Sequence, residues 1–330
     1  MHDVDLLAIG ETMVMVTPRD GGRLTAGADY ALSPGGAESN VAALMAQLGH
    51  STAWASAVGD DPLGDIVVGS LRGHGVDVGL VRRDPHRPTA VYFKDPAPSG
   101  TSVHYYRSGS AASALGRDDL AEWRSRPAAV VHVSGITAAL SEQCRDLLRH
   151  IVFDRPLGGL VSFDVNRRPA LWGPDGGADE LLALARRSDI VFVGRDEAEA
   201  LWGTSDAESV RDLIDAPRYL VVKDADIEAV AFTPEGTVRA ASRRVDVVDP
   251  VGAGDAFAAG WLSGLVDDRP ESMRLRMGHY VASRVLMSPS DFAELPPAGR
   301  VAEIVETGPQ PGADDDRARD PRSDLPCHRP

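Results

Sequence analysis

The stretch Asp249–Phe257 reads DPVGAGDAF and continues into an apolar helical pattern at Ala258, Trp261, Leu262 and Leu265. A Gly-Ala-Gly turn that enters a helix leaves main-chain N–H groups without partners at the positive end of the helix dipole. Phosphate groups bind readily at such a place. Asp255 stands in the first turn of this helix, where it could also be no more than an N-cap. The stretch therefore predicts either a phosphate site beside a carboxylate or an ordinary capped helix.

Short apolar runs recur along the chain and predict the strands of one sheet. They occupy Asp5–Ile9, Ala129–Val133, Leu160–Phe163, Ile190–Val193 and Tyr219–Val222. Helical patterns lie among them at Ser39–Leu48, Ser141–Val152, Ala178–Ala185 and Ala198–Trp202. Strands that alternate with helices imply right-handed crossovers. We therefore expect an α/β fold with a central, mostly parallel sheet, helices on both faces, and ligands beyond the carboxyl ends of the strands.

Two stretches, at about residues 12–33 and 89–108, break this alternation. The second has period-2 patterns, VYFKD and SVHYYR, on both sides of a Pro/Gly/Ser turn, which is typical of a β-hairpin. We expect the two pieces to pair as a small β-sheet lid, whose exposed edge could join a second copy as a homodimer. The predicted domain covers residues 1–306. Residues 307–330 have almost no apolar content and are expected to form a disordered tail.

Charge and composition exclude several classes of protein. The 330 residues carry 34 Lys plus Arg against 49 Asp plus Glu, and the net charge of −15 argues against a nucleic-acid-binding protein. No apolar stretch approaches the roughly 18 residues of a membrane span. The two cysteines, Cys144 and Cys327, lack metal-ligand spacing. We expect a cytoplasmic protein that binds no membrane.

The stretch DPVGAGDAF resembles the C-terminal signature of the ribokinase (PfkB) family of carbohydrate kinases. The resemblance implies that Asp255 is the catalytic base and that the amides of Gly252, Ala253 and Gly254 form an anion hole for the transferred phosphoryl group. It also implies ATP and Mg²⁺ as cofactors. Asp249 is either structural or, as in several members of the family, part of a site for a monovalent cation such as K⁺.

A second motif, SPGGAESNVAALMAQLG at Ser33–Gly49, resembles the first signature of the same family. There the resemblance implies that Gly35, Gly36 and Asn40 touch the sugar. Glycines let the main chain approach a polyol, and an Asn side chain both donates and accepts hydrogen bonds. Taken alone, the motif could be only a turn and a capped helix. With VGDDPLGDIV at residues 58–67, the resemblance extends over about residues 5–300.

Three further strings look like 2-keto-3-deoxygluconate kinases: GETMVMVTP at residues 10–18, VHYYRSGSAAS at 103–113 and SFDVNRRPALW at 162–172. The resemblance implies that a sugar-acid carboxylate meets Tyr105, Arg107 and Arg168, with Tyr92 as a further lid contact. Residues alternate along a strand, so Tyr105 and Arg107 share one face. Surface arginines with aromatic partners are the alternative. A fructose or ribose kinase also stays open, and the residues do not distinguish gluconate-type from galactonate-type keto acids.

The nucleotide side departs from the family pattern. The usual Asn of N-x-x-E is lost at residues 194–197, whereas Glu197 is retained and is expected to help order Mg²⁺. Lys223 is expected beside the nucleotide. Ala225 and Glu228 stand where relatives have glycines near the polyphosphate, and Ser290 stands for a Gly expected near the adenine. These changes leave two hypotheses: an active kinase with an altered nucleotide pocket, or a sugar-acid-binding protein with little turnover.

Overall fold

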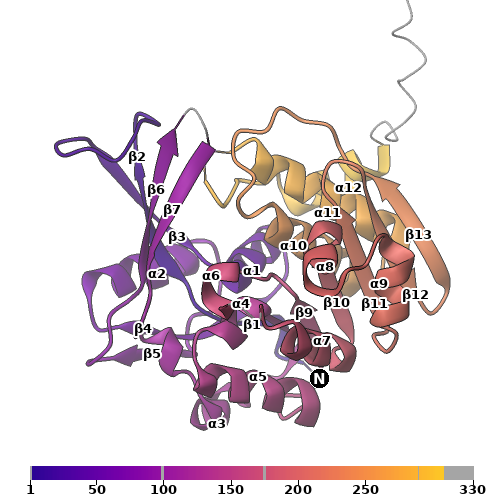
Figure 1. The fold of residues 1–330 in the computed structure, drawn as a ribbon, viewed down its shortest axis with the longest axis horizontal. Helices are drawn as coiled ribbons and strands as arrows, with labels where there is room; N and C mark the ends of the chain where they lie inside the picture. The colour runs from indigo at the N-terminus through magenta and orange to yellow at the C-terminus, as the bar shows by residue number, and fades with distance from the viewer. Residues whose placement is uncertain (1, 98–99, 174–175, 289, 308–330) are drawn as a thin grey trace, which may run out of the picture.

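The strands form a nine-stranded sheet and a separate four-stranded sheet in a computed structural model that describes residues 2–97, 100–173, 176–288 and 290–307 (Figure 1). The order of the large sheet is β13 (Gly236–Ala241), β12 (Glu228–Thr233), β11 (Tyr219–Asp224), β10 (Ile190–Gly194), β9 (Leu160–Asp164), β8 (Ala128–Ser134), β1 (Val4–Ile9), β4 (Thr52–Gly59) and β5 (Val81–Asp84). The pairs β11–β12 and β12–β13 are antiparallel, and the other pairs are parallel.

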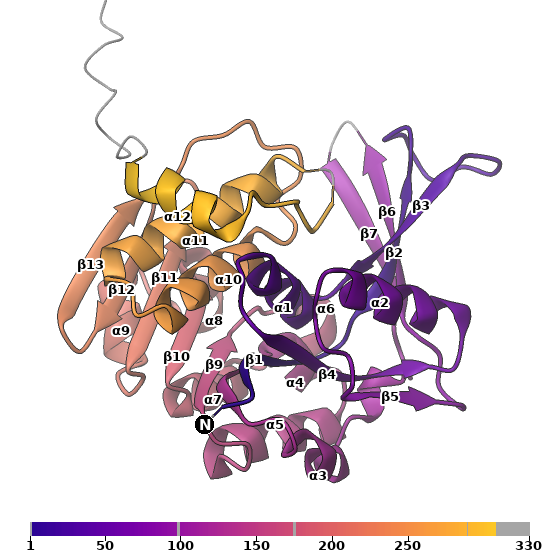
Figure 2. The same ribbon diagram turned by 180° about the vertical axis from the view of Figure 1, so that it is seen from behind.

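Helices cover both faces of the large sheet. One face, seen in Figure 2, packs against α1 (Ala37–Gln47), α2 (Pro62–Gly73), α10 (Ala253–Val266), α11 (Glu271–Leu286) and α12 (Ala298–Thr307). The other face packs against α3 (Leu120–Trp123), α4 (Gly135–Ala139), α5 (Glu142–Asp154), α7 (Ala178–Arg187), α8 (Arg195–Trp202) and α9 (Ala207–Leu213). Leu6 and Ala8 of β1 belong to the first core, and Leu7 and Ile9 belong to the second. This alternation is the reason that the central strand is apolar on both faces.

The small sheet has the order β3 (Tyr30–Gly35), β2 (Met13–Pro18), β6 (Val91–Ala97) and β7 (Gly100–Tyr106). Strand β2 pairs antiparallel with β3 and parallel with β6, and β6 pairs antiparallel with β7. The two predicted lid pieces therefore join into one sheet, which projects from one end of the molecule (Figures 1 and 2). The predicted fold class, with its parallel sheet and additional small sheet, is confirmed.

The structure also contains elements that the sequence did not predict. Strand β4 lies inside the large sheet, and the antiparallel pair β12–β13 extends its far edge. Helix α12 ends at Thr307, one residue beyond the predicted domain, and the rest of the predicted tail lies outside the described residues. In the ranges that the structure describes, no helix combines the length and the apolar character that crossing a membrane requires.

The carboxyl ends of parallel strands bring distant segments to one edge of the large sheet. Glu11 follows β1 by two residues, Asp164 ends β9, and Gly194 ends β10. The amino end of α10 lies at the same edge, because Gly252 and Asp255 line a hollow that Asp164 and Gly194 also line. Short helix α6 (Pro169–Trp172) follows β9 there and begins directly after Arg168.

Candidate active site

Asp255 lies buried in the first turn of α10, with 9% of its surface exposed. Its Oδ2 accepts a hydrogen bond of 3.0 Å from Nδ2 of Asn40, and its Oδ1 accepts one of 3.4 Å from Nδ2 of Asn166. The N-cap residue of the helix is Gly252, which has no side chain to form a cap. Asp255 is therefore not an N-cap, and its carboxylate is held by side chains from α1 and from the loop after β9.

The surroundings of Asp255 raise the pKa of its carboxyl group to about 7. Burial is the largest cause, because a charge in a poorly solvated place is unfavourable, and the neighbouring Asp164 carboxylate acts in the same direction. The Asn40 hydrogen bond and the charges of Arg168 and Lys223 oppose this rise in the pKa. A carboxyl group that titrates near neutral pH can accept a proton from a hydroxyl group and release it again.

The turn before α10 presents main-chain amides beside this carboxylate. Gly252 has a φ of +81°, and a Cβ atom there would lie 2.6 Å from the carbonyl oxygen of Asp291. Only glycine fits this combination of positive φ and close main-chain approach. The Ala253 N–H forms a long bond of 3.4 Å to the Pro250 carbonyl oxygen, and within the described ranges no hydrogen bond engages the N–H of Gly252 or Gly254. The predicted anion hole therefore has donors to offer.

A narrow hollow lies between Asp255 and the lid, with a volume of about 60 Å³, which is room for a few water molecules. The predicted sugar-binding residues that line it are Gly35, Gly36, Asn40, Tyr92, Tyr105, Arg107 and Arg168. A Cβ atom on Gly35 would lie 2.2 Å from the Tyr92 hydroxyl, and one on Gly36 would lie 2.5 Å from the Glu11 carbonyl oxygen. Both glycines are thus required for the close approach of the lid and the loop after β1.

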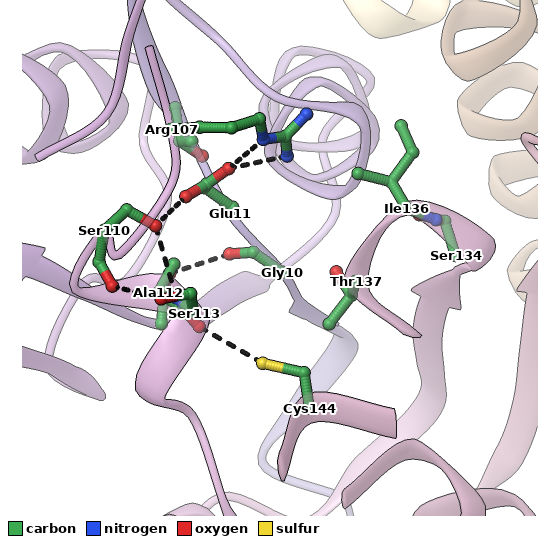
Figure 3. Close-up of polar contacts among 12 residues, drawn as sticks. Gly10, Glu11, Arg107, Ser110, Ala112, Ser113, Ser134, Ile136, Thr137 and Cys144 are labelled. Carbon is green, nitrogen blue, oxygen red and sulfur yellow. Dashed lines mark hydrogen bonds and ion pairs between the residues drawn. The ribbon is translucent and has the colours of Figure 1, made fainter. Parts of the chain in front are cut away.

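Arg107 does not offer a free charge to this hollow. Its Nε donates to Glu11 Oε2 at 2.7 Å, and its Nη2 lies 2.5 Å from the same oxygen. The Ser110 hydroxyl donates to the other carboxylate oxygen of Glu11 (Figure 3). The Glu11 side chain is 1% exposed and the Arg107 side chain 10%. This buried ion pair fixes the guanidinium at the wall of the hollow and neutralises it.

Tyr105 and Arg168 both line this hollow, and they differ in their contacts with other side chains. The Tyr105 ring lies 5.6 Å from the Tyr92 ring and 5.8 Å from the Arg107 guanidinium carbon, whereas the Tyr106 ring lies 5.7 Å from the Phe93 ring. The expected alternation of these two tyrosines is therefore present. Arg168 is exposed, and its guanidinium forms no hydrogen bond or ion pair with the part of the chain that the structure describes. It is the uncompensated positive charge of this wall.

A second, wider hollow of about 570 Å³ lies on the other side of Asp255. Lys223 and Gly254, both predicted to bind the nucleotide, line it together with Asp164, Asp196 and Glu197. The two hollows share the residues Tyr105, Arg168, Val251, Gly252 and Asp255. A ligand in one hollow therefore meets a ligand in the other at the Asp255 carboxylate and the amides of the turn.

The acidic residues of the wide hollow are held in place by nearby donors. Lys223 Nζ donates to Asp164 Oδ2 at 3.1 Å and lies over the Phe192 ring at 5.9 Å. Glu197 accepts from the main-chain N–H groups of Arg167 and, at 3.2 Å, of Gly194. Burial and the charge of Asp164 raise the pKa of Glu197. In the described ranges, no three His, Cys, Asp or Glu side chains are placed to hold a metal by themselves.

Residues 4–296 match the model of the pfkB family carbohydrate kinases. The chain belongs to this family. The 2-dehydro-3-deoxygluconokinase of Bacillus subtilis is 34% identical over 92% of this chain and 95% of its own. Fructokinase-2 of Zea mays is 31% identical over 80% of each chain. The crystal structure of a PfkB protein from Polaromonas superposes with a TM-score of 0.78, at 31% identity, over 87% of this chain and 98% of that one. The protein is thus an ATP-dependent sugar kinase.

Two departures of this pfkB kinase from the family pattern prove to be accommodated locally. Ala225 has a φ of +39° and adopts the left-handed conformation for which relatives use glycine. Glu228 begins β12 and accepts a hydrogen bond from Arg239, so its charge is compensated outside the wide hollow. The Glu228 carboxylate thus has a cationic partner, Arg239, which it shares with Glu208.

Two other expectations for the pfkB kinase concern Ser290 and Asp249. Ser290 lines a pocket with His74 and Phe292, and its place beside the adenine stays a prediction. Asp249 was expected to be structural or part of a monovalent-cation site. Its Oδ1 accepts from the Val251 N–H at 2.9 Å and its Oδ2 accepts from Lys94 Nζ at 2.7 Å. Both side-chain oxygens have partners and Lys94 balances the charge, which fits the structural alternative, and the monovalent-cation site stays a prediction.

The sequence did not single out four residues that shape the site: Glu11, Lys94, Asn166 and Asp291. Asn166 has a φ of +38°, which Asn tolerates better than most residues, and it lies inside the string that supplied Arg168. Lys94 follows Tyr92 by two residues on the same face of β6, which was a usable signal for a buried cation. Glu11 lies inside the string GETMVMVTP, but its partner Arg107 and the partner of Asp291, Lys94, lie about a hundred or more residues away in sequence.

Proposed function

We propose that this pfkB kinase transfers the γ-phosphate of ATP to a hydroxyl group of 2-keto-3-deoxygluconate or its galactonate-type epimer. The observation that carries the choice of a sugar acid is Arg168, an uncompensated guanidinium that lines the lid-side hollow beside Tyr105. A carboxylate pairs well with a guanidinium and a phenol hydroxyl. A neutral sugar lacks the carboxylate that would pair with this guanidinium on the lid side.

Asp255 acts as the general base in this proposal. Its carboxylate stands where the two hollows meet, so a hydroxyl group of the sugar acid can lie against it while the nucleotide occupies the wide hollow. As the hydroxyl oxygen attacks the γ-phosphorus, its proton passes to Asp255 and the bond from phosphorus to the ADP oxygen breaks. The free amides of the turn stabilise the charge on the transferring group.

The nucleotide lies along the wide hollow, near Lys223 and the amino end of α10. Asp164 and Glu197 would orient a Mg²⁺ ion through its water ligands, since both carboxylates line this hollow and Mg²⁺ keeps several waters when it binds phosphates. That ion would neutralise charge on the phosphate oxygens. The binding-protein alternative loses support, because Ala225 adopts the glycine-like conformation and Glu228 is compensated by Arg239.

A fructose-type sugar is the second candidate, and the similarity to the maize fructokinase favours it. The two candidate substrates differ in that only the keto acid has a carboxylate, and an assay can detect this difference. Arg107 does not distinguish them, because Glu11 already neutralises it. Arg168 does.

A coupled assay of ADP release tests the proposal. The acceptors are 2-keto-3-deoxygluconate, its galactonate-type epimer, fructose and ribose, each with Mg-ATP. We expect kcat/KM for one of the keto acids to exceed that for fructose by roughly 100-fold, the effect of one charged hydrogen-bonded pair. The variant Arg168→Ala should lose most of that preference. A higher kcat/KM for fructose than for either keto acid would contradict the assignment.

A further inference from the structure

Lys94 is the most deeply buried cation near the site, with 2% of its side chain exposed. It lies in lid strand β6, and its Nζ bonds to two carboxylates of the main body: Asp249 Oδ2 at 2.7 Å and Asp291 Oδ1 at 2.6 Å. Tyr92, on the same face of β6, donates its hydroxyl to Asp291 Oδ2 at 2.6 Å. One strand of the lid therefore binds the body through two adjacent side chains.

Both carboxylates are attached to the turn that carries the amides. Asp249 bonds through its other oxygen to the N–H of Val251, the residue before Gly252. The main chain of Asp291 packs closely on Gly252. A Cβ atom added to Gly252 would lie 2.6 Å from the Asp291 carbonyl oxygen. Any force that moves Asp249 or Asp291 therefore moves the turn, and Lys94 holds the two together.

The electrostatics require a cation at this point. Asp249 and Asp291 are both nearly buried, with side chains 13% and 6% exposed, and two carboxylates around one point repel each other unless a positive charge lies between them. Desolvation alone would lower the pKa of Lys94, but the two carboxylates together outweigh it and the pKa is raised. The side chain is an ammonium ion, comparable in charge and size to a small monovalent cation.

We propose that Lys94 is a positioning residue that serves as a tethered cation for the anion-hole turn, so that the turn is complete only when the lid is closed and no free monovalent cation is required. The proposal names Lys94 as the link between the sugar-binding lid and the phosphoryl site. It rests on the proposed base and anion hole, but not on the identity of the sugar.

The variants Lys94→Ala and Lys94→Met test this proposal. Steady-state rates are measured with the best acceptor of the panel in K⁺, NH₄⁺ or tetramethylammonium salts, together with thermal melting in each salt without any acceptor. The wild type should show the same kcat and the same melting temperature in all three salts. Lys94→Ala should lose kcat by roughly 10- to 100-fold, the usual effect of a misplaced catalytic group, with a smaller change in KM.

The salt response of the two variants then separates a positioning cation from a merely structural side chain. K⁺ or NH₄⁺, but not tetramethylammonium, should restore part of kcat in Lys94→Ala and raise its melting temperature. Lys94→Met fills the space and should gain nothing from any salt. Arg23→Ala is the matched control, because it removes an exposed lid cation that pairs with Asp95, next to Lys94, and should leave kcat unchanged.

The proposal is overturned if the wild type needs K⁺ for activity, if Lys94→Ala keeps the wild-type kcat, or if tetramethylammonium restores it as well as K⁺ does. Failure of the keto-acid assignment would appear differently, as a change in which acceptor is best. The ratio of variant to wild-type rates and the melting curves do not depend on that choice.

Discussion

The two hollows that meet at Asp255 differ in volume and in how their charges are arranged. The lid-side hollow measures about 60 Å³, and the charges of Arg107, Lys94 and Glu11 on its walls are already paired and buried. The other hollow measures about 570 Å³ and is lined both by the exposed Asp196 and by the paired Lys223 and Asp164. A narrow hollow whose charges are mostly paired suits a small ligand, whereas a wide hollow suits a large ligand that brings a metal ion with it.

Asp255 belongs to both hollows, so its removal should have the largest effect. We expect Asp255→Asn to lower kcat by roughly 10²- to 10⁴-fold, since an amide cannot accept the proton. Sugar binding, measured by calorimetry, should change little because Asn40 still has a partner oxygen. A variant with nearly wild-type turnover would remove Asp255 from the role of base.

The two arginines of the lid-side hollow provide the sharpest test of the difference between paired and unpaired charges. We expect Arg168→Ala to raise KM for the keto acid roughly 10- to 100-fold, from the loss of one charged pair. Its melting temperature should stay near that of the wild type, because the guanidinium has no partner within the described ranges.

Arg107→Ala should behave in the opposite manner. It leaves the buried Glu11 carboxylate without its cation, which costs about 3–5 kcal/mol of folding free energy and lowers the melting temperature by several degrees. Calorimetric melting and steady-state kinetics on both variants check this pair. Equal stabilities for the two variants would show that the Glu11–Arg107 pair does not stabilise the fold.

The smallest expected effect lies at the edge of the wide hollow. Ala225→Gly removes a Cβ atom at a φ of +39° and should increase the free energy of unfolding by about 1 kcal/mol or less, after the greater freedom of glycine in the unfolded chain is subtracted. The control Ala241→Gly, in extended strand β13, should instead lose stability slightly. Chemical denaturation measures both, and a loss in Ala225→Gly would mean that the left-handed conformation is not strained.

Much of the fold could be predicted, because repeated apolar runs and turns are local patterns. The five runs around Ile9, Val133, Phe163, Val193 and Val222 are all strands of the large sheet. Strand β4 was missed because its sequence, TAWASAVG, is rich in small residues that carry little strand preference. Strand β12 was missed because its sequence, EAVAFT, begins with Glu and contains two alanines, which have little strand preference.

The site could be predicted only where a residue belongs to a motif. Asp255, its turn, Asn40 and Arg168 lie in sequence motifs that can be recognised without knowledge of the fold. The partners of charged groups cannot be recognised in this way, since Lys94 and Asp291 are 197 residues apart and only the folded sheet brings them together. For the same reason the sequence could not show that Arg107 is neutralised by Glu11 whereas Arg168 is free.

The central claim is that burial between the two hollows makes Asp255 a base that works near neutral pH. The most direct measurement is the pH dependence of kcat/KM for the keto acid. Because the deprotonated form is the active one and the pKa is raised to about 7, kcat/KM should rise about tenfold per pH unit at acid pH and level off above pH about 7. A curve that levels off near the ordinary carboxyl value of 3.8 would contradict the account.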